Sequence, residues 1–121
     1  MTTTTSGTTA PEPGPGRAGL TSMTKVEVVV RGEDIPSVRE LFTATGVSGF
    51  TGVSGVSGLG HDGYHEGRLL FNDQEPMTLL ITVVPNDRVE ALLAGLRTLF
   101  ADRSGVLFVS EVYVSRPDYF R

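Results

Sequence analysis

The stretch MTLLITVVPNDRVEALLAGLRTLF, residues 77–100, decides the fold because it joins a strand to a helix through a proline. Residues 77–84 are almost entirely apolar or β-branched, which favours a strand. Pro85 ends that strand, and Asp87 followed by Glu90 is a capping signal for a helix. The apolar side chains of this predicted helix recur at helical spacing: Val89, Leu92, Leu93, Leu96 and Phe100.

The residues before this stretch repeat the order of a strand followed by a helix. Residues 25–31, KVEVVVR, alternate apolar and polar side chains with one extra valine, which predicts a strand with some burial on both faces. Residues 33–45 carry apolar side chains at helical spacing, with Pro36 in the opening turn and Gly46 after the last turn. They therefore predict a helix.

Three further segments complete the order of elements. The glycine-rich residues 46–58 begin as a second strand, residues 59–76 form a long loop, and residues 106–114 form the last strand. The order strand-helix-strand-loop-strand-helix-strand predicts a ferredoxin-like α+β fold. In that fold, a four-stranded antiparallel sheet carries both helices on one face.

Both faces of the predicted sheet carry apolar side chains, although two helices cover only one of them. Apolar residues of the strands at 77–84 and 106–114 point alternately to the two faces. In residues 77–84, Leu79, Ile81 and Val83 point to one face, and Leu80 and Val84 point to the other. In residues 106–114, Phe108, Val112 and Val114 point to one face, and Leu107, Val109 and Tyr113 point to the other. We therefore expect other subunits to bury the second face.

The composition excludes several classes of protein. The chain has 121 residues, enough for one compact domain, which we place at residues 23–121. A net charge of −4 argues against nucleic-acid binding, and the lack of cysteine excludes thiol chemistry. No apolar run reaches the roughly 18 residues of a membrane span, so we expect a cytoplasmic protein without direct membrane insertion. Residues 1–22, rich in Thr, Ser, Gly and Pro, predict a disordered tail, and Met23 is a candidate start.

The segment GVSGFTGVSGVSG, residues 46–58, has a glycine at every third position. Collagen needs many more such triplets and abundant proline, and a flexible linker would lack the valines and the phenylalanine. Two interpretations stay open. One is a plain strand and turn, and the other is a strand whose glycines admit a ligand and lead into a phosphate-binding turn.

Three short motifs, taken in their order along the chain, resemble the PII signal-transduction family. They are G-x-x-G-F-T at Gly46 to Thr51, Ser57-Gly58-Leu59-Gly60, and V-V-P-N at Val83 to Asn86. The resemblance covers residues 23–116. It implies a trimer in which residues 59–76 form the long T-loop between the second and third strands.

Other residues distinguish this chain within that family. Val106 stands where nitrogen-regulatory members have a phosphate-binding lysine, His61 replaces an arginine, and Arg116 alone remains of an arginine pair. The stretch FADRSGVLF, residues 100–108, is more similar to PII-like proteins associated with bicarbonate transport and carboxysomes. That resemblance implies binding of ADP or AMP between subunits, with cyclic AMP and bicarbonate as further candidate ligands. ATP should bind less well, because its outer phosphate would lack a cation.

The resemblance also implies roles for single residues. The turn at residues 58–60 would hold phosphate, Thr51 would contact the adenine edge across the subunit interface, and Val29 and Thr78 would wall the base. Residues 103–105 would form a short phosphate loop. The complete nucleotide-binding set is Val29, Thr51, Gly58, Leu59, Gly60, His61, Thr78, Arg103, Ser104, Gly105 and Arg116. Each of these is also explained as an ordinary strand, turn or loop residue, so the set is a hypothesis.

The loop at residues 59–76 supplies a candidate surface for a partner, such as an inorganic-carbon transporter. Its candidate contact residues are Tyr64, Leu69, Leu70 and Phe71. Alternatively, residues 69–71 extend the following strand.

We expect neither a catalytic nor a metal site. The acidic residues of the loop are scattered, and no serine lies in a nucleophile elbow. His61 and His65 lie four residues apart, but Gly63 separates them and no H-E-x-x-H motif accompanies them. Two alternative functions on this architecture stay open: a small phosphatase or phosphotransferase, and a metal-tolerance trimer.

Overall fold

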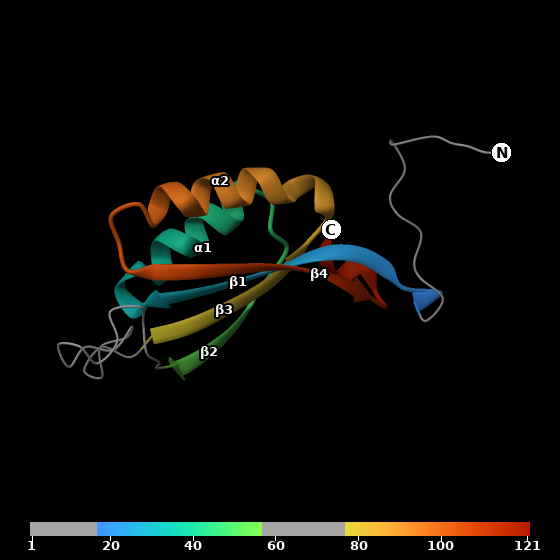
Figure 1. The fold of residues 1–121 in the computed structure, drawn as a ribbon, viewed down its shortest axis with the longest axis horizontal. Coiled ribbons are helices and arrows are strands. Elements are labelled where there is room, and N and C mark those ends of the chain that lie inside the picture. Colours follow the sequence, from blue (N-terminus) through green and yellow to red (C-terminus); the bar gives the residue numbers. More distant parts are fainter. Residues whose placement is uncertain (1–16, 57–76) are drawn as a thin grey trace.

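The computed structural model describes residues 17–56 and 77–121 of the chain. Its strands form one sheet, and two helices lie across that sheet (Figure 1). The strands are β1 (Thr21–Arg31), β2 (Thr51–Val56), β3 (Met77–Val84) and β4 (Gly105–Val114), and the helices are α1 (Ile35–Ala44) and α2 (Val89–Leu99). Short 3₁₀ turns lie at Gly32–Asp34, Asn86–Arg88 and Pro117–Phe120.

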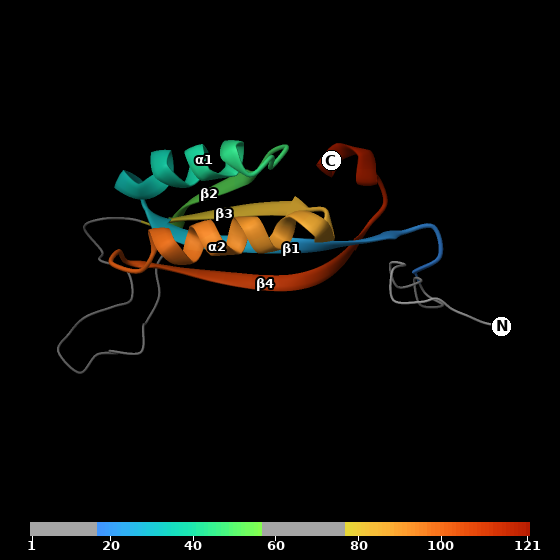
Figure 2. The same cartoon turned by 90° about the horizontal axis from the view of Figure 1, so that it is seen from above.

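The sheet has the order β2-β3-β1-β4, and each neighbouring pair of strands is antiparallel. Both helices cover the same face of the sheet, as the views in Figure 1 and Figure 2 show. The prediction of a ferredoxin-like α+β fold is therefore confirmed. The trimer stays a prediction, and residues 1–16 and 57–76 lie outside the described part of the chain.

The main core lies between the helices and the face of the sheet that they cover. Alternate residues of β1 point to this face, where Val26, Val28 and Val30 are fully buried. The cluster is completed by Val38, Phe42, Leu80, Val84, Leu92 and Leu96. Burying an aliphatic or aromatic side chain contributes about 1.5–3 kcal/mol, so these contacts hold both helices on one face.

The opposite face, which we call the open face, is also apolar. Val29 lies between Leu79 and Val106 of the neighbouring strands, in a second cluster of buried side chains. Phe108 is on the open face as well, and 55% of it is exposed, whereas its neighbour Val109 points to the helix-covered face. The prediction that the strands are apolar on both faces is therefore confirmed.

β1 begins at Thr21 instead of at Lys25. Thr21 and Ser22, which the sequence placed in the N-terminal tail, are the first residues of the strand and pair with residues 114 and 113 of β4. Arg17 contacts the same part of β4, because its Nη1 donates to the Tyr113 hydroxyl at 3.1 Å. Pairing with β4, rather than local composition, therefore extends the strand into polar sequence.

The predicted capping of the second helix by Asp87 and Glu90 is wrong. Helix α2 begins at Val89, after the N-cap residue Arg88, and no side chain caps it. The preceding 3₁₀ turn is closed by a 3.0 Å bond from the Arg88 N–H to the Pro85 carbonyl. This turn runs directly into the helix. Backbone hydrogen bonding in the turn therefore starts the helix without a side-chain cap.

Candidate functional site: two ends of one sheet

The predicted site residues in the described part of the chain fall at two separate places on the sheet. One group lies where β1 ends and β4 begins, and we call it the Arg103 end. It consists of Val29, Thr78, Arg103, Ser104 and Gly105. The second group, Thr51 and Arg116, lies towards the opposite end, and we call it the Arg116 end. A ligand that needs both groups therefore cannot be held by one end of a single chain.

At the Arg103 end, the loop between α2 and β4 carries the arginine. Arg103 Nη1 donates to Oδ1 of Asp34 at 3.1 Å, across 69 residues of sequence. The arginine side chain is 42% exposed, and the aspartate side chain is 7% exposed. The cation therefore lies half in solvent, where a ligand can reach it, and is held from behind by a buried carboxylate.

Asp34 contacts the candidate site residue Arg103, and the sequence did not indicate it. It lies at the N-cap position of α1, but its side chain makes no capping hydrogen bond. Its Oδ2 is buried and has no hydrogen-bond partner among the residues that the structure describes. In the sequence, GEDIP is typical of the first turn of a helix, and nothing in that pattern indicates a contact with a distant arginine.

Gly105 has a packing role at the same end. A Cβ atom added at this residue would lie 2.9 Å from two ring carbons of Phe100. Real Cβ atoms do not approach an aromatic ring so closely, so the glycine lets the ring lie against the loop. This contact supports the interpretation of Gly105 as a turn residue, and it also fixes the position of the loop that carries Arg103.

Val29 and Thr78 do not line one pocket within a chain. Val29 pairs with Leu79 and points to the open face, whereas Thr78 pairs with Val30 and points to the other face. The two side chains therefore lie on opposite faces within a chain, and their shared role at a base between subunits stays a prediction. Side chains alternate between faces along a strand, so one residue of offset places them on opposite sides.

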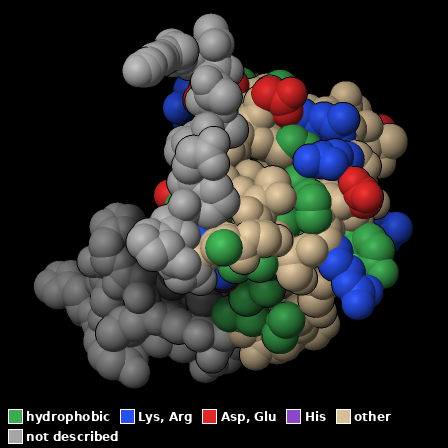
Figure 3. Space-filling model, turned by 90° about the vertical axis from the view of Figure 1, so that its right-hand side faces the viewer, with side chains coloured by type: hydrophobic (Ala, Val, Ile, Leu, Met, Phe, Trp, Pro, Cys, Tyr) green, Lys and Arg blue, Asp and Glu red, His purple; other side chains and the backbone are tan. Residues whose placement is uncertain are grey.

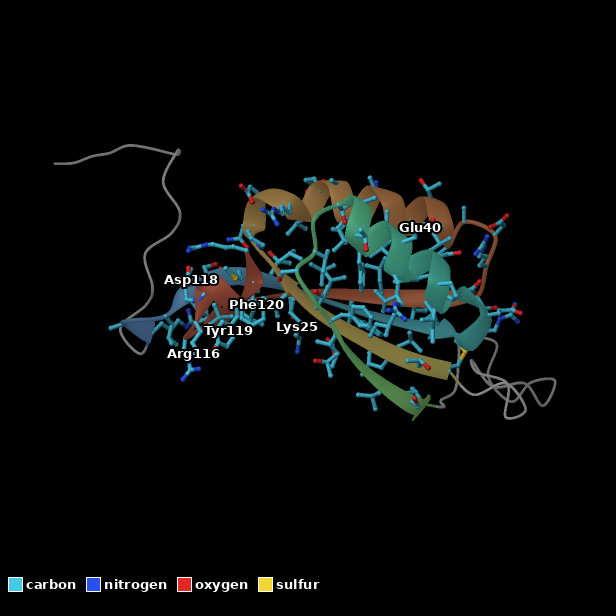
Figure 4. All side chains as sticks on the ribbon, turned by 180° about the vertical axis from the view of Figure 1, so that it is seen from behind. Lys25, Glu40, Arg116, Asp118, Tyr119 and Phe120 are labelled. Atoms are coloured by element: carbon cyan, nitrogen blue, oxygen red, sulfur yellow. The ribbon has the colours of Figure 1, made fainter. Side chains whose placement is uncertain are left out.

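At the Arg116 end, the arginine interacts with an aromatic ring instead of a carboxylate. Arg116 Nη1 donates to the Tyr119 hydroxyl at 2.9 Å, and its guanidinium carbon lies 5.5 Å from the ring centre. Figure 4 shows Arg116, Tyr119 and Phe120 together at this end of the molecule. Tyr119 is 66% exposed and Arg116 is exposed as well, so this pair lies at the surface.

A hollow of about 300 Å³ lies beside these residues. It is lined by Ser48, Gly49, Phe50, Thr51, Ile81, Thr82, Val83, Tyr119 and Phe120. Two hydrogen bonds shape it: Ser48 Oγ donates to the Tyr119 carbonyl at 3.2 Å, and Thr82 Oγ1 donates to the Gly49 carbonyl at 2.6 Å. Figure 3, which faces this end, shows hydrophobic side chains close to Lys and Arg side chains, with Asp and Glu side chains also present. The end thus combines apolar surface with charged side chains of both signs.

Several predicted site residues lie outside the described part of the chain. They are Gly58, Leu59, Gly60, His61, Tyr64, Leu69, Leu70 and Phe71. Their roles in nucleotide and partner binding stay predictions, and His65 lies in the same segment.

The described residues contain no group of three or more His, Asp or Glu side chains that is arranged to hold a metal ion. Within the same residues, neither helix has the length and apolarity needed to cross a membrane.

The fold and the two ends define a class of protein. It is a ferredoxin-like α+β domain in which each end of the sheet carries an arginine that is a candidate ligand-binding residue. Residues 23–119 match the family described as nitrogen regulatory protein P-II. The chain therefore belongs to the P-II family. No curated protein sequence matches it significantly.

Solved structures of PII-like proteins are similar to this chain. CPII, a nitrogen regulatory PII-like protein from Thiomonas intermedia K12, bound to ADP, AMP and bicarbonate, is 34% identical with a TM-score of 0.71. The similarity covers 84% of this chain and 96% of CPII. CPII bound to ADP and bicarbonate gives the same identity and TM-score over 84% and 97% of the two chains. A PII-like signaling protein from Thermus thermophilus has 19% identity and a TM-score of 0.65, over 84% and 98%, and shows the fold alone.

Proposed function

We propose that this protein is a trimeric, cytoplasmic PII-like regulator that binds ADP or AMP between its subunits. Cyclic AMP and bicarbonate are further ligands of the same site. Residues 59–76 act as the T-loop and carry the signal to a partner such as an inorganic-carbon transporter. The similarity to CPII, which is bound to ADP, AMP and bicarbonate, supports the choice of ligands.

The observation that carries the proposal is the separation of the two arginines. Arg103 precedes β4 and Arg116 follows it, so a strand of 10 residues lies between them. At about 3.3 Å per residue, that strand spans about 33 Å, which is longer than a nucleotide. Both arginines can reach one nucleotide only if the Arg103 end of one subunit meets the Arg116 end of another.

The open face supports the trimer. Phe108 and Val53 on this face are 55% and 44% exposed, and they lie on opposite edge strands of the sheet. An apolar surface that extends across the sheet is typical of a subunit interface.

We assign no catalytic role to any residue. Nothing in residues 17–56 and 77–121 favours the phosphatase, the phosphotransferase or the metal-tolerance alternative over ligand binding.

Calorimetry of the complete chain tests the proposal. We expect AMP and ADP to bind, ATP to bind more weakly, and bicarbonate to change the nucleotide affinity. Light scattering in the same buffers should give the mass of a trimer. A protein that binds none of these nucleotides, or that is a monomer at micromolar concentration, would refute the proposal.

Hydrogen exchange of residues 59–76 tests the signalling role. A ligand shifts a loop between two states only if it binds those states with different affinity. We expect slower exchange in this segment with ADP, and a further change with bicarbonate. If exchange were the same in all conditions while ADP bound, the loop would not report the ligand.

A further inference from the structure

Asp34 is the one buried charged residue in the described part of the chain. The other buried polar residue, Thr82, has its hydroxyl bonded to a carbonyl oxygen, but Asp34 has one carboxylate oxygen without a partner among the described residues. Asp34 is not among the predicted nucleotide-binding residues, and its side chain does not cap the helix either. Its buried charge therefore needs an explanation.

The pair that Asp34 makes with Arg103 leaves most of the guanidinium available. A guanidinium carries five N–H donors, and the bond to Asp34 uses Nη1. Because 42% of the arginine side chain is exposed, its other donors can contact a phosphate while the bond to Asp34 remains.

Arg103 is not free to leave the carboxylate. A buried charge that loses its partner is strongly destabilising, so the two side chains stay paired when a ligand binds. A phosphate at this loop therefore meets an arginine whose charge is largely offset by the carboxylate behind it. The repulsion between Asp34 and the ligand increases with the number of charges on the phosphate chain.

We infer that Asp34 is a positioning residue that also determines specificity. It holds Arg103 at the phosphate loop, and its negative charge selects nucleotides with few phosphate charges, AMP and ADP, over ATP. This inference rests on the proposed function, because it concerns the same nucleotide site.

The variant Asp34→Asn removes the charge and keeps an oxygen that can accept the bond from Arg103. All three nucleotides should then bind more tightly, AMP by about threefold and ATP by about tenfold or more, because the lost repulsion is larger for the more highly charged ligand. The gain should shrink at higher salt, as screening predicts. Calorimetry with AMP, ADP and ATP at two salt concentrations measures both effects.

Glu33→Gln is the matched control. Glu33 is the preceding residue, its side chain is 65% exposed, and it forms an ion pair with Arg31 at 2.6 Å. The substitution makes the same change in net charge, but it should leave the ratio of ATP to AMP affinity within about twofold of the wild type, since a solvated charge is screened.

If Asp34→Asn does not fold, the double variant Asp34→Asn/Arg103→Gln replaces it. It is compared with Arg103→Gln alone, so that only the charge of residue 34 differs, and its ratio of ATP to AMP affinity should be at least about threefold higher than that of Arg103→Gln.

An Asp34→Asn protein with an unchanged ATP to AMP ratio would overturn the inference while the proposed function stood, and so would a double variant whose ratio was no higher than that of Arg103→Gln. A wild type that binds no nucleotide would overturn both.

Discussion

The two ends of the sheet hold an arginine in different ways. At the Arg103 end, the guanidinium is backed by a buried carboxylate, whereas at the Arg116 end it lies against the exposed ring of Tyr119. The first arrangement fixes the side chain and offsets its charge. The second leaves the arginine exposed beside a largely apolar hollow. In the proposed site, the two arginines would therefore have different roles: Arg103 would position a phosphate, and Arg116 would attract it.

The largest expected effect comes from preventing the two ends from meeting. Phe108→Glu places a carboxylate on the open face, and burying it against another subunit without a partner is costly. We expect a monomer by light scattering and loss of ADP binding by calorimetry.

Val109→Glu is the control for that variant. Val109 is 45% exposed and lies next to Phe108 on the same strand, but it points to the helix-covered face. It should leave the trimer intact. A trimeric Phe108→Glu protein would show that the open face is not the interface.

Mixing two variants tests whether the ends meet between subunits. Arg103→Ala and Arg116→Ala should each weaken ADP binding about ten- to a hundredfold, because each removes a charge-assisted hydrogen bond. In trimers assembled from equal amounts of both, about a quarter of the interfaces would contain both arginines. Those interfaces should bind ADP with wild-type affinity in calorimetry.

The recovery in mixed trimers is specific to a shared site. If both arginines acted within one chain, mixing would restore no high-affinity site, and the proposed arrangement would be wrong. Melting temperatures of the separate variants should be measured too, since Arg103→Ala leaves Asp34 without its cation.

Much of the fold follows from local patterns, and much of the site does not. The alternation in residues 77–84 and the helical spacing in residues 89–100 predicted a strand and a helix, because those periods directly reflect which face is buried. The pair of Asp34 and Arg103 joins residues that are 69 positions apart. A contact of that kind depends on strand order and helix placement, and no local pattern contains that information.

The assignment of residues to the two faces of the sheet also depends on information that no local pattern contains. The resemblance to a family assigned Val29 and Thr78 to the wall of one base, and no local pattern indicates which faces residues of two different strands occupy. Strand register, given by the pairing of Val29 with Leu79, places the two side chains on opposite faces within a chain, so their shared role at a base between subunits stays a prediction. The length of β1 was missed for a related reason, because pairing with β4 extends it into polar residues.

Gly105→Ala should affect the Arg103 end alone. The added Cβ would meet the ring of Phe100 at 2.9 Å, and a rigid ring relieves such a contact only by moving the loop. We expect a loss of about 1–3 kcal/mol in the free energy of unfolding, which is typical of overpacking, and weaker ADP binding as Arg103 moves. Urea unfolding and calorimetry measure the two effects.

Gly49→Ala is the matched change at the Arg116 end. Gly49 lines the hollow, but an added Cβ there would meet nothing within 4 Å. Its effect on stability should stay within about 0.5 kcal/mol. Equal losses in the two variants would contradict the packing role of Gly105.

Tyr119→Phe should have the smallest effect, and it separates the two contacts that Tyr119 makes with Arg116. The variant removes the hydroxyl that accepts the 2.9 Å hydrogen bond and keeps the ring beneath the guanidinium. The contact is exposed, so its loss should weaken ADP binding by no more than about threefold. Tyr119→Ala removes the ring as well and should weaken binding further, because Arg116 then loses both contacts with Tyr119. If Tyr119→Phe weakened ADP binding as much as Arg116→Ala, the hydroxyl itself would contact the ligand, and Arg116 would be its support.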